Sequence, residues 1–141
     1  AIGRSCEVKA EIVARDEREA GPRALLNLGH TFVHAIETVQ GYGTWLHGEA
    51  VAAGIAMAAR FSVKLGRLPA ADAERLVALL ARAGLPTHPP RMAPPAWLEA
   101  MGRDKKNESG RITLILLEAL GHASIEKAAP TEALESFLAA P

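Results

Sequence analysis

Residues 27–49, NLGHTFVHAIETVQGYGTWLHGE, decide how this chain is expected to fold and where its chemistry lies. Apolar residues recur at helical spacing on both sides of the glycine-rich QGYG at 40–43, which predicts two helices joined by a turn. The stretch also holds three of the five histidines of the chain, His30, His34 and His47. Neutral imidazoles are common metal ligands and general acids or bases near neutral pH, so this segment is the candidate functional site.

The two helices of this stretch are predicted to cover residues 23–40 and to run from about His47 to Leu65. One face of the first helix carries four polar residues spaced three or four apart: Asn27, His30, His34 and Glu37. The second helix is rich in alanine and glycine on several sides, which is typical of a buried, closely packed helix. An antiparallel arrangement of the pair would bring His47 back toward His30.

The rest of the chain is predicted to be mainly helical, with one β-hairpin near the C-terminus. Further helices are expected over 1–14, 72–83 and 95–101 and from residue 131 onward, and the hairpin is expected within 112–128. The proline-rich segment 87–95 is interpreted as an extended connector inside a single domain, because too little chain follows it to form a second core. No glycine-rich phosphate loop follows a predicted strand, so no dinucleotide site is expected within residues 1–141.

Composition narrows the class of protein. Lys plus Arg equal Asp plus Glu at 16 each, which gives no electrostatic case for binding nucleic acid or an anionic membrane. The single cysteine, Cys6, excludes an internal disulfide framework and favours a reducing, cytoplasmic location; it is expected to be a small core residue. The chain begins without methionine in what reads as mid-helix, which predicts a processed product, an excised domain or one half of a larger protein.

From the residues alone, the histidines favour a metal site. A catalytic zinc typically takes three protein ligands and leaves one position open, and His30, His34 and His47 could converge on one ion. HTFVH lacks the glutamate of the zinc-protease signature HExxH, so that chemistry is not indicated. Ordinary polar packing of the histidines remains an alternative. Arg23, Asn27 and the DKK turn at 104–106 could bind a phosphate or carboxylate, although the two lysines taken alone are better explained by a solvated loop.

Three segments carry a family resemblance: RDEREAGPRALLNLGHTFVHAIE at 15–37, GYGTWLHGEAVAAGIAMA at 41–58, and DKK at 104–106 before a β-rich run. Together they resemble 3-dehydroquinate synthase, of the sugar-phosphate cyclase superfamily. The match covers nearly the whole chain but only the helical C-terminal domain of that two-domain fold. The resemblance implies that an N-terminal NAD-binding domain precedes residue 1.

The resemblance also implies roles for individual residues. A zinc ion, replaceable by cobalt, would be held by His30, His47 and a glutamate upstream of Ala1. His34 would be a substrate-contacting acid or base, and Glu19 a proton acceptor. Four residues match positions that bind the carboxylate, hydroxyls or phosphate of the substrate: Lys9, Arg23, Asn27 and a lysine of the DKK turn, with Lys106 favoured over Lys105. Val33 and Ala20 stand where the family commonly has glycine, so a helix contact or pocket wall is expected to adjust around Val33.

The implied reaction is the NAD-dependent conversion of the seven-carbon sugar-acid phosphate DAHP into 3-dehydroquinate with elimination of phosphate. The resemblance places this lyase in the shikimate pathway of aromatic amino acid biosynthesis and implies a homodimer. Residues 1–141 alone are expected to be inactive and to bind zinc weakly. Three alternatives remain: another sugar-phosphate cyclase such as a 2-deoxy-scyllo-inosose synthase, a metal-dependent alcohol dehydrogenase, or a non-catalytic helical module with structural histidines.

Overall fold

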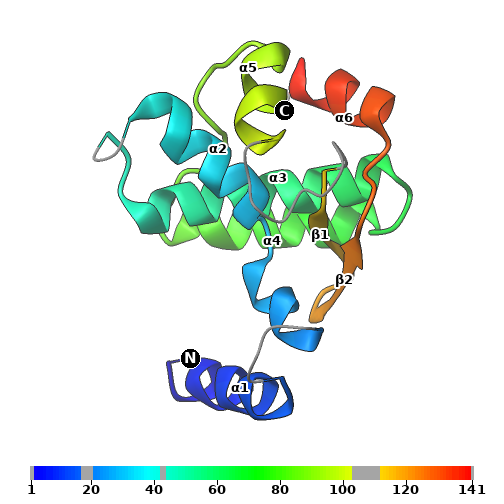
Figure 1. Ribbon diagram of the computed structural model, residues 1–141. Coiled ribbons are helices and arrows are strands. Elements are labelled where there is room, and N and C mark those ends of the chain that lie inside the picture. The colour runs from blue at the N-terminus through cyan, green and yellow to red at the C-terminus, as the bar shows by residue number, and fades with distance from the viewer. Residues whose placement is uncertain (1, 17–20, 42–43, 103–111, 141) are drawn as a thin grey trace.

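The computed structural model describes residues 2–16, 21–41, 44–102 and 112–140, which are mainly helical with one two-stranded antiparallel sheet (Figure 1). The elements in chain order are α1 (Ile2–Arg15), the 3-10 helix η1 (Pro22–Asn27), α2 (His30–Gln40), α3 (His47–Lys64), α4 (Ala70–Arg82), α5 (Pro94–Gly102), β1 (Leu114–Ala119), β2 (His122–Glu126) and α6 (Thr131–Leu138). The predicted class, mainly α with a hairpin near the C-terminus, is confirmed. No helix in the described part of the chain is both long and apolar enough to cross a membrane.

The core is built around α3, which passes through the middle of the molecule and packs against α2, α4, β1 and α6 (Figure 1). Most of its buried residues are alanines, so neighbouring elements approach its backbone closely. The rings of Phe32, Phe61 and Phe137 pack where α2, α3 and α6 meet, with the Phe61 and Phe137 centroids 5.2 Å apart. Both helices of the histidine segment therefore pack into the main hydrophobic core.

The hairpin is fastened to α3 by Ser62, whose side chain is fully buried. Its Oγ donates to the carbonyl oxygen of Ala58 at 2.7 Å and accepts the backbone N–H of Leu117 at 2.9 Å. Leu117 pairs with Ala123 across the hairpin, so this hydrogen bond joins the sheet to the central helix. The hydroxyl thereby satisfies a strand donor that would otherwise be buried without a partner.

The proline-rich connector at 87–95 contacts the central helix α3. Arg60 of α3 donates from Nη1 to the carbonyl oxygen of Thr87 at 2.6 Å. Burial lowers the pKa of Arg60 from its ordinary value, which still leaves the guanidinium charged at neutral pH. The side chain of Arg60 thus joins the connector to the central helix.

The predicted continuous helix over residues 23–40 is wrong. The chain forms η1, breaks at Leu28 and Gly29, and restarts as α2 at His30. Gly29 has φ +76°, a left-handed conformation that favours glycine, and a Cβ at this position would lie 2.5 Å from the carbonyl carbon of Gly54. The break is therefore set by contact with α3. Consequently Asn27 and His30 do not share one face of a single helix.

The valine at position 33 is accommodated by a glycine on the facing helix. Val33 is fully buried, and a Cβ added to Gly54 would stand 2.6 Å from Val33 Cγ2 and 2.8 Å from the carbonyl oxygen of Gly29. The extra bulk of Val33 fits because α3 has no side chain at this point. Ala20, the second departure from the family pattern, lies outside the described residues.

α1 lies apart from the body of the molecule, and its main contact among the described elements is η1 (Figure 1). None of its residues is buried, and Ile2 is 82% exposed. Cys6 is exposed, so the prediction that it is a core residue is wrong. The apolar stripe of α1 is real, but within the described chain no second element covers it.

Candidate metal and substrate site

The two helices of the histidine segment run antiparallel. Gly29, just before α2, meets Gly54 of α3, whereas Glu37, two turns further along α2, meets His47 at the start of α3. His47 begins its helix because the Glu49 carboxylate accepts the N–H of Leu46 at 2.9 Å, one half of a capping box. Local capping and close helix packing together bring the two ends of the segment to one place.

Three imidazoles gather at this place. The ring centroid of His30 lies 6.1 Å from that of His34 and 6.5 Å from that of His47. His30 is half-buried, whereas His34 and His47 are exposed. The predicted return of His47 toward His30 is thus confirmed, with His30 in the middle of the cluster.

The two histidines implied as metal ligands are held in the same way through Nδ1. His47 Nδ1 lies 2.7 Å from Glu37 Oε1, and His30 Nδ1 lies 3.4 Å from the carbonyl oxygen of Leu28. Ionised carboxylates and carbonyls only accept hydrogen bonds, so the neutral imidazoles carry their protons on Nδ1 in both cases. This tautomer leaves Nε2 as the nitrogen with the lone pair, the form in which histidine binds a metal.

These donors fit part of a zinc site. Two imidazoles on one tetrahedral zinc hold their ring centroids about 5 Å apart. At 6.5 Å, His30 and His47 stand somewhat wider than that spacing. Within the described residues, no group of three His, Cys, Asp or Glu side chains is placed to hold a metal. A site made of His30, His34 and His47 alone, which the sequence left open, is therefore not formed. The two imidazoles could supply part of a metal site, and the described residues add no third ligand to them.

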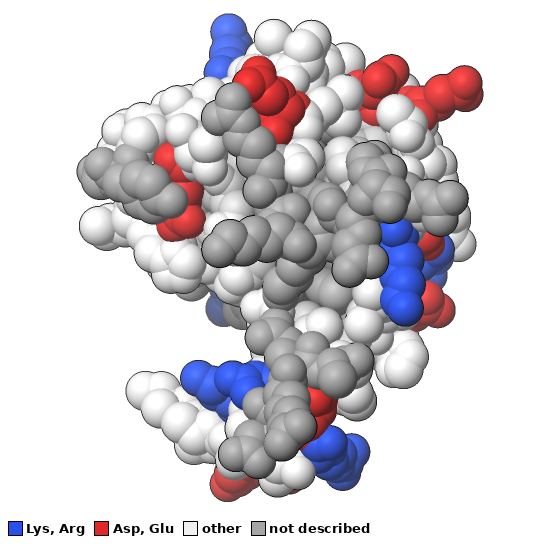
Figure 2. Space-filling model, viewed as in Figure 1, with Lys and Arg blue, Asp and Glu red and all other residues white. Residues whose placement is uncertain are grey.

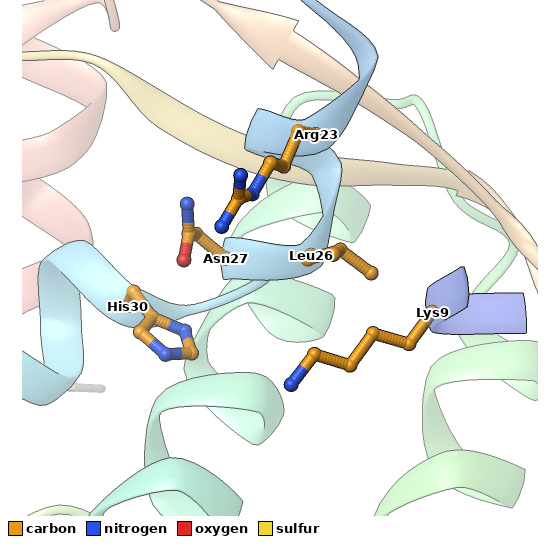
Figure 3. Close-up of a pocket in the computed structure, with 5 residues that line it drawn as sticks. All are labelled: Lys9, Arg23, Leu26, Asn27 and His30. Atoms are coloured by element: carbon orange, nitrogen blue, oxygen red, sulfur yellow. The ribbon is translucent and has the colours of Figure 1, made fainter. Parts of the chain in front are cut away.

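A pocket of about 360 Å³ adjoins the imidazoles, lined by Lys9, Arg23, Leu26, Asn27 and His30 (Figure 3). Lys9 reaches toward His30 from α1, while Arg23 and Asn27 extend into the same space from η1 (Figure 3). Figure 2 shows the surface hollowed between α1 and the rest of the molecule, with basic side chains on α1. Two cations, an amide and an imidazole are the donors that a phosphate or carboxylate group takes.

Asp16 organises the backbone that carries these donors. Its Oδ2 accepts the N–H of Gly21 at 2.7 Å and the N–H of Arg23 at 3.0 Å, at the beginning of η1. The sequence analysis assigned no role to Asp16. These contacts span five and seven residues, which is longer than the local capping patterns that a sequence reveals.

The structure brings most of the predicted site residues together. Four of them line the pocket: Lys9, Arg23, Asn27 and His30. His34 and His47 flank His30. Glu19 and Lys106, and the alternative Lys105, lie outside the described residues. The catalytic, substrate-binding and metal-binding roles of the whole set stay predictions.

A family model described as 3-dehydroquinate synthase C-terminal matches residues 1–107. The chain belongs to this family. The 3-dehydroquinate synthase of Neisseria meningitidis serogroup C (strain 053442) is 57% identical over 138 residues, covering 98% of this chain and 38% of that protein. The 3-dehydroquinate synthase of Nitrosomonas europaea is 54% identical over 140 residues, covering 99% of this chain and 38% of that protein. The chain therefore spans about two fifths of the length of the curated relatives it matches.

Solved structures of cyclases share the fold. ValA, a 2-epi-5-epi-valiolone synthase from Streptomyces hygroscopicus subsp. jinggangensis 5008 with NAD+ and Zn2+ bound, matches 96% of this chain and 37% of its own, with TM-score 0.82 and 24% identity. A 2-deoxy-scyllo-inosose synthase complexed with carbaglucose-6-phosphate, NAD+ and Co2+ matches 94% of this chain and 38% of its own, with TM-score 0.78 and 22% identity. These likenesses establish the dehydroquinate synthase-like fold of the helical domain.

Proposed function

We propose that these residues form the metal- and substrate-binding part of a 3-dehydroquinate synthase. The whole enzyme would convert DAHP into 3-dehydroquinate with elimination of phosphate. The observation that carries the proposal is the pocket in which Lys9, Arg23 and Asn27 meet His30, beside His47. Membership of the 3-dehydroquinate synthase family supports the choice of reaction. In this proposal NAD is bound mainly by an N-terminal domain that precedes residue 1.

The pocket residues would bind and orient the substrate. Arg23 offers a planar fork suited to an oxyanion, and Lys9 a mobile point charge that can follow a second one. Asn27 can both donate to and accept from a sugar hydroxyl. Holding the substrate at several points fixes the reacting atoms in one geometry, which lowers the entropic part of the barrier.

His30 and His47 would hold zinc or cobalt, together with a carboxylate ligand from outside this chain. When bound, the metal would supply Lewis-acid polarisation of a substrate hydroxyl, and NAD would supply a reversible hydride acceptor. His34 stands on the same face of α2 as His30 and would move a proton at the substrate. Glu19 would accept a proton, and Lys106 would contact the phosphate.

The proposed oligomeric state, reaction class, pathway, location and partners are those that the family resemblance implies. The protein would act as a homodimeric lyase in the shikimate pathway, in the cytoplasm, with neither nucleic acid nor membrane as partner. Identity of 54–57% to 3-dehydroquinate synthases favours this substrate over those of other cyclases.

The direct test is phosphate release from DAHP by the full-length protein that carries these residues, in the presence of NAD+ and Zn2+. We expect turnover that is lost on chelation and restored by Zn2+ or Co2+. Glucose 6-phosphate, which lacks the carboxylate, should not be consumed. Phosphate release from glucose 6-phosphate but not from DAHP would instead identify another sugar-phosphate cyclase. Metal-independent stability with no turnover of either would leave the non-catalytic module as the correct interpretation.

A further inference from the structure

The inference concerns Glu37, an acidic residue of α2 that none of the roles above uses. Its side chain is 18% exposed, and its Oε1 lies 2.7 Å from Nδ1 of His47. The described residues give Glu37 no lysine or arginine partner. Among the described residues, the hydrogen-bond partner of this largely buried carboxylate is an imidazole. Such an arrangement is unusual for a contact that serves stability alone.

As a structural link, the contact is weak. The His47 side chain is 68% exposed, and a contact with so exposed a partner contributes little to stability. α2 and α3 are already held together by the buried contact between Val33 and Gly54. The helix pair therefore does not need Glu37 in order to form.

The same hydrogen bond is well suited to orienting the His47 ring. A carboxylate that accepts Nδ1–H fixes the tautomer of His47 and turns its Nε2 outward as the donor. The centroid of the His47 ring then lies 6.5 Å from that of His30, whose Nδ1 is likewise directed at an oxygen. A divalent cation bound between the rings would also offset the negative charge of Glu37, which no described basic side chain neutralises.

We propose that Glu37 is a positioning residue for the metal ligand His47, holding its ring in the ligating tautomer and raising the affinity of the site for a divalent cation. This inference rests on the proposed function, because that proposal makes His47 a ligand. It adds a residue to which the family comparison assigned no role. Glu37 acts through His47 and does not itself touch the metal or the substrate.

The test measures metal affinity in the full-length protein. Apo-protein is titrated with Zn2+ in competition with a chromophoric chelator, and Co2+ is added separately to record the visible absorption of the bound ion. Glu37→Ala is expected to weaken zinc binding about 10–100-fold, the usual effect of removing a carboxylate behind a ligating histidine. Glu37→Gln should weaken it less, because an amide oxygen still accepts the Nδ1–H. The cobalt spectrum of Glu37→Ala should change in shape as well as intensity.

Glu49→Gln is the matched control. Glu49 lies two residues after His47 and caps α3, so its substitution removes a negative charge near the site without touching the imidazole. Glutamine can still cap the helix, and zinc affinity should stay within about twofold of the parent, since charge effects between exposed groups are small. Weakening of zinc binding by Glu49→Gln as large as that by Glu37→Ala would mean that overall charge, not orientation, sets the affinity, and would overturn the inference.

Two further measurements, the melting temperature and phosphate release, distinguish failure of the positioning role from failure of the proposed function. The melting temperature of the metal-free protein should be nearly the same in the parent and in Glu37→Ala. A large fall there with unchanged zinc affinity would mark Glu37 as a purely structural residue and overturn the proposal. Phosphate release from DAHP is measured on the parent alone. If the parent binds zinc in a Glu37-dependent way but does not turn over DAHP, the proposed function fails while the positioning role stands.

Discussion

Replacing Gly54 by alanine tests how α2 and α3 set the distance between His30 and His47. Gly54 lies in the middle of α3, where Gly29 and Val33 of the preceding segment press against its backbone. An alanine Cβ would stand 2.6 Å from Val33 Cγ2 and 2.8 Å from the Gly29 carbonyl oxygen. Both distances are shorter than real Cβ contacts, so the two helices must separate.

Two opposing effects set the magnitude. Alanine is favoured over glycine inside a helix by about 1 kcal/mol. Overpacking of a filled core costs about 1–3 kcal/mol, and the upper half of that range applies here because the Gly29 oxygen belongs to the backbone and cannot turn aside. The expected net result is a loss of about 1–2 kcal/mol in the free energy of unfolding. A wider gap between α2 and α3 should also weaken zinc binding in the full-length protein.

The assay is urea denaturation of the 141-residue chain followed by circular dichroism, with Gly48→Ala as the control. Gly48 lies in the same helix, and a Cβ added there meets nothing within 4 Å, so this substitution should be neutral or stabilising. The double variant Gly54→Ala with Val33→Ala should recover only part of the loss, because the clash with Gly29 persists. If Gly54→Ala is as stable as Gly48→Ala, the inferred contact does not constrain the helix pair and the reasoning is refuted.

Three further predictions follow from other contacts. Asp16→Ala should raise the KM of the full-length protein for DAHP about 2–30-fold with little change in kcat, because the lost turn cap holds the backbone of Arg23 and is worth about 0.5–2 kcal/mol. An unchanged KM would show that Arg23 is placed without Asp16. Ser62→Ala should destabilise the chain by about 1–3 kcal/mol in urea denaturation, because the buried N–H of Leu117 loses its acceptor; a neutral result would mean that water replaces the hydroxyl. Residues 1–141 alone should release no phosphate from DAHP and should bind zinc far more weakly than the full-length protein; turnover by this polypeptide would contradict the division of the site between two parts.

Much of the fold could be predicted because its signals are local. Helical periodicity, glycine stops and a β-rich run placed α3, α4, α5, the hairpin and α6 within a few residues of their observed bounds. The approach of His47 to His30 was also predictable, because a short turn between two helices favours antiparallel packing. The exposed state of Cys6 was not, since periodicity shows that a helix has an apolar stripe but not what covers it.

By itself, the amino-acid sequence determined the helical class and, through its motifs, the family, and it named the candidate site residues. Only the tertiary structure decided how the side chains of those residues are positioned and hydrogen-bonded. The interruption at Gly29 depends on Gly54, which lies on another helix. The tautomer of His47 depends on Glu37, ten residues away across a turn. The reason is physical: periodicity and capping act between neighbours along the chain, whereas close backbone approach and the direction of a hydrogen bond exist only after two distant segments have packed together.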